Sequence, residues 1–158
     1  MQLITQFARR DLAATSARMR KVVETMPDAA LTWQPPAPEI NSVAQIVRHV
    51  AVGQRHLLGM AAGDGPVITS MDPYQRGLNN DPATRAELLG LLTETDAVRE
   101  RILAGLDTMD LSETVAGFGV PQSPRFFLVA YSIGEAREHL GHAELTAQLW
   151  QSQRPSPP

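Results

Sequence analysis

The sequence predicts an all-α protein, a four-helix bundle, and three observations lead to that prediction. Apolar residues recur at intervals of three and four in four segments, at about residues 2–26, 43–62, 84–106 and 124–150, which is the spacing of amphipathic helices. The segments between them are rich in proline, glycine and small polar residues, as loops are. No convincing strand pattern is present, since the run FGV is too short to count as one. Four helices of this length without a sheet are typical of a bundle.

Local signals place the ends of these helices. Pro27 is expected to end the first helix, because proline cannot continue one. Ser42 is predicted to cap the second helix through its hydroxyl. Ser123 and Pro124 are predicted to start the last helix, with serine as the cap and proline at the first helical position. The third helix is predicted to be scaffold, its charged residues forming a solvated surface: Glu94, Asp96, Arg99, Glu100 and Arg101.

A long loop is predicted between the second and third helices, at residues 63–83, where Gly, Pro, Asp and Asn occur throughout. Such a loop in a compact domain either crosses the length of the bundle or forms a wall over a site, and the sequence leaves both open. Residues 1–150 are expected to form a single bundle domain, because 158 residues suit one domain. Residues 151–158 are polar and proline-rich and are expected to be a disordered tail.

Composition and charge argue against several classes of function. The net charge is −3 and there is no basic run, so no nucleic-acid partner is expected, because such binding depends on clustered Lys and Arg. The chain has no cysteine, which excludes thiolate metal sites and cysteine nucleophiles and leaves nitrogen and oxygen as metal ligands. The N-terminus lacks the apolar core of a signal peptide, and no apolar run is long enough to span a membrane. A cytoplasmic protein without a membrane partner is therefore expected.

Three potential metal ligands lie on one stripe of residues 131–149, within the last predicted helix. At about 100° per residue, His139 lies about 40° from Glu135, and His142 lies about 20° from Glu135 on the other side. The chain has only four histidines, so this grouping is unusual. The same residues could instead form a solvated face, or stabilise the helix through pairs four residues apart.

His49 is the best candidate for a ligand from a facing helix. It shares a heptad-like row of the second helix with Gly53 and His56, and His56 is two turns away, too far to share an ion with it. His49, Glu135 and His139 would form a two-histidine, one-carboxylate set, which leaves coordination positions open as catalytic sites do. His142 could replace one ligand or hydrogen-bond to one. A single inward-facing histidine is more often a hydrogen-bonded core residue, so the set, and not His49 alone, favours a metal.

Two segments resemble the DinB-like, or DinB/YfiT-like, superfamily of metalloenzymes. The segment LTWQPPAPEINSVAQIVRHV is similar to that family's Trp…Pro turn followed by a helix with one histidine, and EAREHLGHAEL is similar to its final-helix motif. The resemblance implies a bundle, often dimeric, that holds a divalent metal through His49, His139 and the residue at position 135. The family commonly has histidine where this chain has Glu135, which puts the identity of the metal in doubt, since a carboxylate still binds zinc, nickel or iron.

The resemblance implies a metal-dependent enzyme that acts on a small molecule, either as a thiol S-transferase or as a hydrolase, in stress response or detoxification. The alternative is a non-catalytic metal-binding or stress-induced bundle. Because the chain has no thiol of its own, the nucleophile would be water or an external low-molecular-weight thiol. His142 and Glu138 could relay protons, or either could simply be a surface residue or a neighbour of a ligand, an interpretation that suits Glu138 better. A homodimer is also expected from the resemblance, in keeping with a broad apolar face that carries Phe126, Phe127, Val129 and Ala130.

Overall fold

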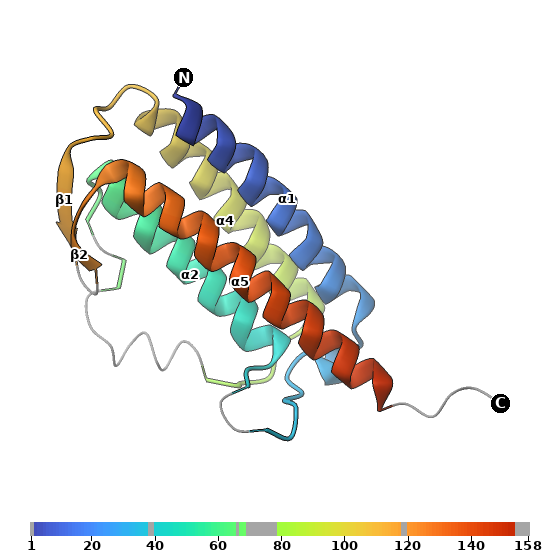
Figure 1. Cartoon of the computed structure of the whole chain (residues 1–158). Coiled ribbons are helices and arrows are strands. Elements are labelled where there is room, and N and C mark those ends of the chain that lie inside the picture. Colours follow the sequence, from blue (N-terminus) through green and yellow to red (C-terminus); the bar gives the residue numbers. More distant parts are fainter. Residues whose placement is uncertain (1, 38–39, 66, 69–78, 118–119, 154–158) are drawn as a thin grey trace.

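The computed structural model describes residues 2–37, 40–65, 67–68, 79–117 and 120–153, and it confirms the all-α prediction. Four long α-helices pack side by side (Figure 1), and their ends lie within two residues of the predicted ones: α1 (Leu3–Thr25), α2 (Val43–Ala62), α4 (Arg85–Leu106) and α5 (Arg125–Ser152). A single 3₁₀ turn, η1 (Asp28–Ala30), follows α1. No described helix is both long and apolar enough to cross a membrane. Gln151 and Ser152, which were predicted to belong to the tail, are part of α5, and residues 154–158 lie outside the described residues, so disorder of the tail stays a prediction.

The helices α1 and α5 run in one direction, and α2 and α4 run in the other (Figure 1). Two ion pairs show that α1 and α5 are parallel. Asp11 of α1 pairs with Arg137 of α5. Seven residues further along both helices, Arg18 pairs with Glu144. Both α4 and α5 pack against α1 and α2. The bundle is therefore square in section, with α2 and α5 as antiparallel neighbours.

The long connection from α2 to α4 begins at one end of the bundle and ends at the other. At its start, α2 ends on Gly63, whose φ of 88° is readily adopted only by glycine. At its end, Asn80 accepts a hydrogen bond from Ser42 (2.6 Å), beside the beginning of α2. Of the two predictions for this loop, the structure therefore supports the crossover. The prediction of a wall over a site, made for the whole loop 63–83, stays a prediction, because residues 66 and 69–78 lie outside the described residues.

Side-chain caps fix two helix starts, one as predicted. The Ser42 hydroxyl accepts the N–H of Gln45 (3.2 Å), and the Gln45 side chain accepts the N–H of Ser42 (2.9 Å), which is a complete capping box. Thr84 and Glu87 form the same arrangement at the start of α4. The prediction for Ser123 was wrong, because its hydroxyl donates to the carbonyl of Pro121 (2.9 Å), and α5 begins without a side-chain cap.

A small antiparallel hairpin precedes α5, so the expectation of no strands was wrong locally. Its strands, β1 (Thr114–Gly117) and β2 (Val120–Pro124), pair with an irregular register. Arg125 holds the hairpin to the bundle, because its guanidinium bonds both the Glu113 carboxylate and the carbonyl of Ala61 on α2. The flexible end of the Met60 side chain lies directly over Gly117 and would have to move if residue 117 carried a side chain.

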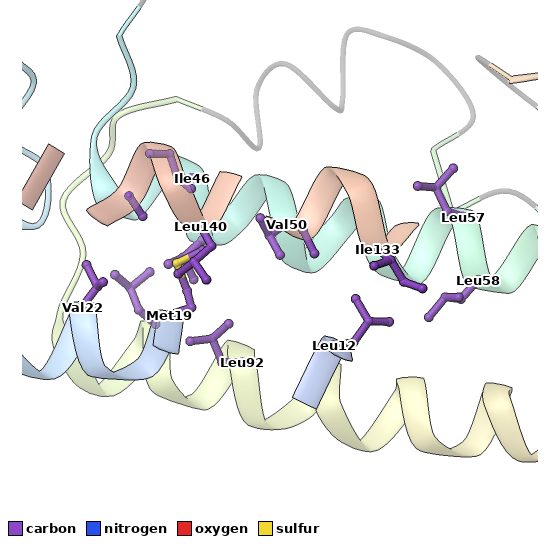
Figure 2. Close-up of a cluster of buried hydrophobic side chains, with 14 of the residues drawn as sticks. Leu12, Met19, Val22, Ile46, Val50, Leu57, Leu58, Leu92, Ile133 and Leu140 are labelled. Carbon is purple, nitrogen blue, oxygen red and sulfur yellow. The ribbon is translucent and has the colours of Figure 1, made fainter. Parts of the chain in front are cut away.

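Apolar side chains from all four helices meet in one core (Figure 2). The largest fully buried ones include Leu12, Met19, Leu58, Leu88, Leu103 and Leu128. Val129 also lies in this core, fully buried, although it was expected on an outer face with Phe126 and Phe127, which are indeed exposed. Arg99 was expected on a solvated surface and is instead 4% exposed, paired with Asp96 (2.8 Å) and Glu100 (3.3 Å).

Candidate metal centre

Two neighbouring helices bring the three predicted ligands together. His49 lies in the second turn of α2, whose start is fixed by the Ser42 capping box. Glu135 and His139 lie one turn apart in the middle of α5, which is packed against α2. The apolar residues beside them, Val50 and Ala136, are buried. The three polar side chains therefore lie at the edge of the core, each between 19% and 31% exposed.

The distances between the three side chains fit a shared ion better than direct hydrogen bonds. Glu135 Oε2 lies 3.5 Å from His49 Nε2 and 3.4 Å from His139 Nε2. These separations exceed the usual N–H···O range of about 2.7–3.2 Å. Two donors bound at about 2.0–2.2 Å to one tetrahedral ion lie about 3.3–3.6 Å apart. One ligand atom from each of the three residues lies within 4.8 Å of the others, so this group could hold a metal ion.

The electrostatics of the site favour a neutral imidazole at His139. Burial lowers the pKa of His139 below its ordinary value, and the neighbouring His49 lowers it further, against the opposing effect of Glu135. The two rings lie with their centroids 4.2 Å apart and their planes at 66°. A neutral imidazole keeps a lone pair free, and this is the form in which histidine binds metals.

A small cavity of about 10 Å³ adjoins the three side chains, and Gln54 of α2 also lines it. Gln54 is 6% exposed, and among the described residues no donor reaches its side-chain oxygen. A buried acceptor without a donor costs about 1–3 kcal/mol, so such an atom is expected where a bound species supplies the missing hydrogen. The unpaired Gln54 oxygen beside two histidines and a carboxylate therefore fits a site built for a hydrated ion or a metal-bound ligand.

The other predicted site residues lie near this group but outside it. His142 is exposed, and its ring centroid lies 5.6 Å from that of His139. Glu138, the residue directly before His139 on α5, is also exposed. His56, predicted to be too far from His49 to share an ion, is buried and accepts a hydrogen bond from the N–H of Ile68 (3.2 Å).

Tyr131 and Gln54 are two residues of the site that the sequence prediction missed. The negative charge of Glu135 raises the pKa of Tyr131 above its ordinary value, and burial and a hydrogen bond to the same carboxylate add to this. Tyr131 lies four residues before Glu135, so helical spacing could have identified it. Gln54 lies about 140° around α2 from His49, so periodicity gave no sign of it, and only its long side chain brings it to the cavity.

The chain is therefore a helical bundle with a candidate metal centre, which two histidines and a carboxylate form between two of its helices. The family model of the DinB superfamily matches residues 11–143. The chain belongs to the DinB superfamily, which confirms the resemblance found in its two motifs. No protein of curated function matches it significantly.

Solved structures with the same fold are distant in sequence. A conserved protein from Enterococcus faecalis superposes with a TM-score of 0.76 at 20% identity, over 97% of this chain and 99% of that one. A mycothiol-dependent maleylpyruvate isomerase superposes with a TM-score of 0.66 at 12% identity, over 89% of this chain. This chain spans only 62% of the isomerase. At such identities the likeness shows the shared fold alone.

Proposed function

We propose that the protein is a divalent-metal-dependent enzyme that acts on a small molecule, either transferring a low-molecular-weight thiol or hydrolysing its substrate. His49, Glu135 and His139 would hold the ion, with zinc, nickel or iron as the candidates for this mixed nitrogen and oxygen set. The observation that carries the proposal is the separation of 3.4 and 3.5 Å between the carboxylate oxygen and the two imidazole nitrogens. Membership of the DinB superfamily is consistent with it.

A bound divalent ion supplies Lewis acidity, which lowers the pKa of a water or thiol that it binds. The side chains of this chain do the rest. Burial lowers the pKa of His139, which favours the neutral form that can act as a ligand, and the oxygen of Gln54, which no described donor reaches, can orient an O–H or N–H donor in the cavity. His142 and Glu138 are both exposed, so we assign them the transfer of protons between the site and solvent.

An external thiol is the nucleophile that we favour for a transfer reaction. The chain itself has no cysteine, so a thiol must come with a second molecule. The mycothiol-dependent isomerase, which shares the fold, is named for its need of such a thiol. Water would take the same place in a hydrolase, and the residues of the site do not distinguish the two.

Metal content and turnover together test this function. Protein purified without a metal-affinity column is expected to contain close to one divalent ion per chain, measured by elemental analysis. His49→Ala and His139→Ala should each lose most of it, because each removes one of three protein ligands. His56→Gln is the matched control: that histidine is buried on the same helix as His49 but outside the group, and this variant should keep its metal.

Full metal retention in both alanine variants would rule out the assigned ligands. Turnover of electrophilic substrates, assayed with and without small thiols, should then disappear on chelation and return with metal. A non-catalytic metal-binding bundle is the second candidate, and the small size of the cavity at the three ligands, about 10 Å³, favours it. Stoichiometric metal without any turnover would support that alternative.

A further inference from the structure

A second, larger pocket lies in the same groove between α2 and α5. It has a volume of about 280 Å³ and is lined mainly by apolar side chains, among them Ile40, Ile46, Leu145 and Leu149. Leu145 and Leu149 are 53% and 38% exposed, although leucine side chains gain free energy when they are covered. This pocket is therefore an apolar surface open at one side.

The pocket adjoins the candidate metal centre on both helices. On α2, Ile46 lies three residues before His49, which is a rise of about 4.5 Å. On α5, His142 lines the pocket and lies three residues after His139, with the two ring centroids 5.6 Å apart. His142 therefore borders the pocket on one side and the metal centre on the other. A molecule in the pocket can reach the three ligands within about one helical turn.

The walls of the pocket recognise apolar groups, not charge. Its buried polar side chain, Thr146, is neutral and points its hydroxyl at the carbonyl of Asn41 (3.4 Å), so it offers no charge to a ligand. A cavity of about 150 Å³ accommodates benzene, so about 280 Å³ has room for one substituted aromatic ring or a chain of about six to eight carbons. The enclosed space at the three ligands, about 10 Å³, has room for little more than one water or ion, so a polar head group would approach from the solvent side, where the three side chains are 19–31% exposed.

We propose that this pocket binds the apolar part of the substrate, whose reacting end lies at His49, Glu135 and His139. The substrate class is then an amphiphilic small molecule, with an alkyl or aryl group of about six to eight carbons joined by a short linker to a polar, metal-binding head. His142 lies where the linker passes and can hydrogen-bond to it. This inference rests on the proposed function, because it takes the three ligands as the reacting end of the site.

The test uses the zinc-loaded full chain and n-alkyl hydroxamates, which carry a metal-binding head on chains of different length. Each methylene buried in the pocket should tighten binding about fourfold, so hexanohydroxamate, with four more methylenes, should bind about 200-fold more tightly than acetohydroxamate in calorimetry. In Leu145→Ser and Leu149→Ser the gain should fall below tenfold, with acetohydroxamate binding unchanged. Leu3→Ser, which alters an exposed leucine on α1, is the matched control and should keep the full gain.

A second arm measures the pocket without metal. Titration of the metal-free protein with 1-hexanol should shift the methyl NMR signals of Ile46, Leu145 and Leu149, while ethanol should not. If acetohydroxamate binds and affinity does not rise with chain length, this inference is overturned and the proposed metal site stands. If no hydroxamate binds, the proposed function fails, and an absence of hexanol shifts would overturn the pocket as well. If the methyl NMR signals move on dilution but do not respond to hexanol, a second copy of the chain covers the pocket, and this result would also overturn the inference.

Discussion

The buried arginine of α4 makes Asp96 the most informative position for a test of stability. The Asp96 carboxylate accepts hydrogen bonds from Arg99 (2.8 Å) on its own helix and from Ser16 (3.0 Å) and Arg20 (2.8 Å) on α1. Asp96→Ala removes all three. Among the described residues, Arg99, which is 4% exposed, then keeps Glu100 as its one charged partner, at 3.3 Å.

The expected loss in the free energy of unfolding depends on Arg99, whose buried charge loses a partner in Asp96→Ala. Hydrogen bonds to a charged group contribute about 1.5–3 kcal/mol each, but their effects do not add when they share one carboxylate. Removing one partner of a buried ion pair costs about 3–5 kcal/mol. Asp96 itself is 27% exposed and Arg99 retains Glu100, so the lower end applies, and Asp96→Ala should lower the free energy of unfolding by about 3 kcal/mol.

Glu144→Ala is the matched control, because it also removes an acid that pairs with an arginine of α1. Its bonds to Arg18 are short, 2.7 and 3.0 Å, but that arginine is 63% exposed. A pair of this kind contributes about 0.2–1 kcal/mol. Comparing the two variants therefore separates the effect of burial on stability from the effect of hydrogen-bond geometry. The higher helix propensity of alanine, by a few tenths of a kcal/mol over either acid, makes both measured losses slightly smaller.

Urea unfolding at 25 °C, followed by circular dichroism, measures both losses. In thermal unfolding, about 3 kcal/mol should lower the Tm by about 6–12 °C, since 1 kcal/mol corresponds to about 2–4 °C in a domain of this size. If Asp96→Ala lost no more than Glu144→Ala, with unchanged m values, the reasoning from burial would be refuted.

Three further predictions concern a cap, a carboxylate and an outer face. Ser42→Ala should cost about 1–2 kcal/mol in urea unfolding, because it removes the cap of α2 and a buried bond to Asn80; an unchanged midpoint would show that neither matters. The hydrogen bond from Thr5 lowers the pKa of Asp107 below its ordinary value. The ionised Asp107 therefore stabilises the fold at pH values above its ordinary pKa, and this stabilisation is lost as the pH falls through the lowered pKa of the folded protein. Asp107→Asn should therefore flatten the fall of the Tm in acid, and an acid limb as steep as that of the wild type would contradict this. Phe127 is exposed and stacks on a neighbouring tyrosine at 6.1 Å, so the predicted homodimer should weaken in Phe127→Ser; sedimentation that gives a monomer at tens of micromolar wild-type protein would remove the prediction.

Helical periodicity predicted the fold well because every helix buries one long apolar stripe. The errors arose where a single local rule competed with tertiary contacts. Ser123 had the sequence of a cap, yet its hydroxyl bonds within the hairpin. Arg99 continues the heptad row of Thr95 and Ile102, so its spacing pointed inward, but a charged residue is usually exposed and that rule decided the prediction.

The candidate site was predictable to the extent that its residues share a helix. Glu135 and His139 are four positions apart, and periodicity places them together. His49 faces these two residues only if α2 and α5 are neighbours. The heptad-like spacing of α2 made this plausible, and the packing of the two helices in the structure shows it. Gln54 required the structure, since its position on α2 points away from His49.

The order of the ligands along the chain bears on how the protein is made. His49 leaves the ribosome with α2, whereas Glu135 and His139 follow only after α4 and the hairpin have been synthesised. Until then Ile46 and Val50, which α5 covers in the finished bundle, lack that cover. A nascent chain at this stage exposes apolar surface that favours aggregation, and the arrival of α5 both buries that surface and completes the site. Premature termination before α5 would therefore release a fragment that is prone to aggregate and unable to bring the three proposed ligands together.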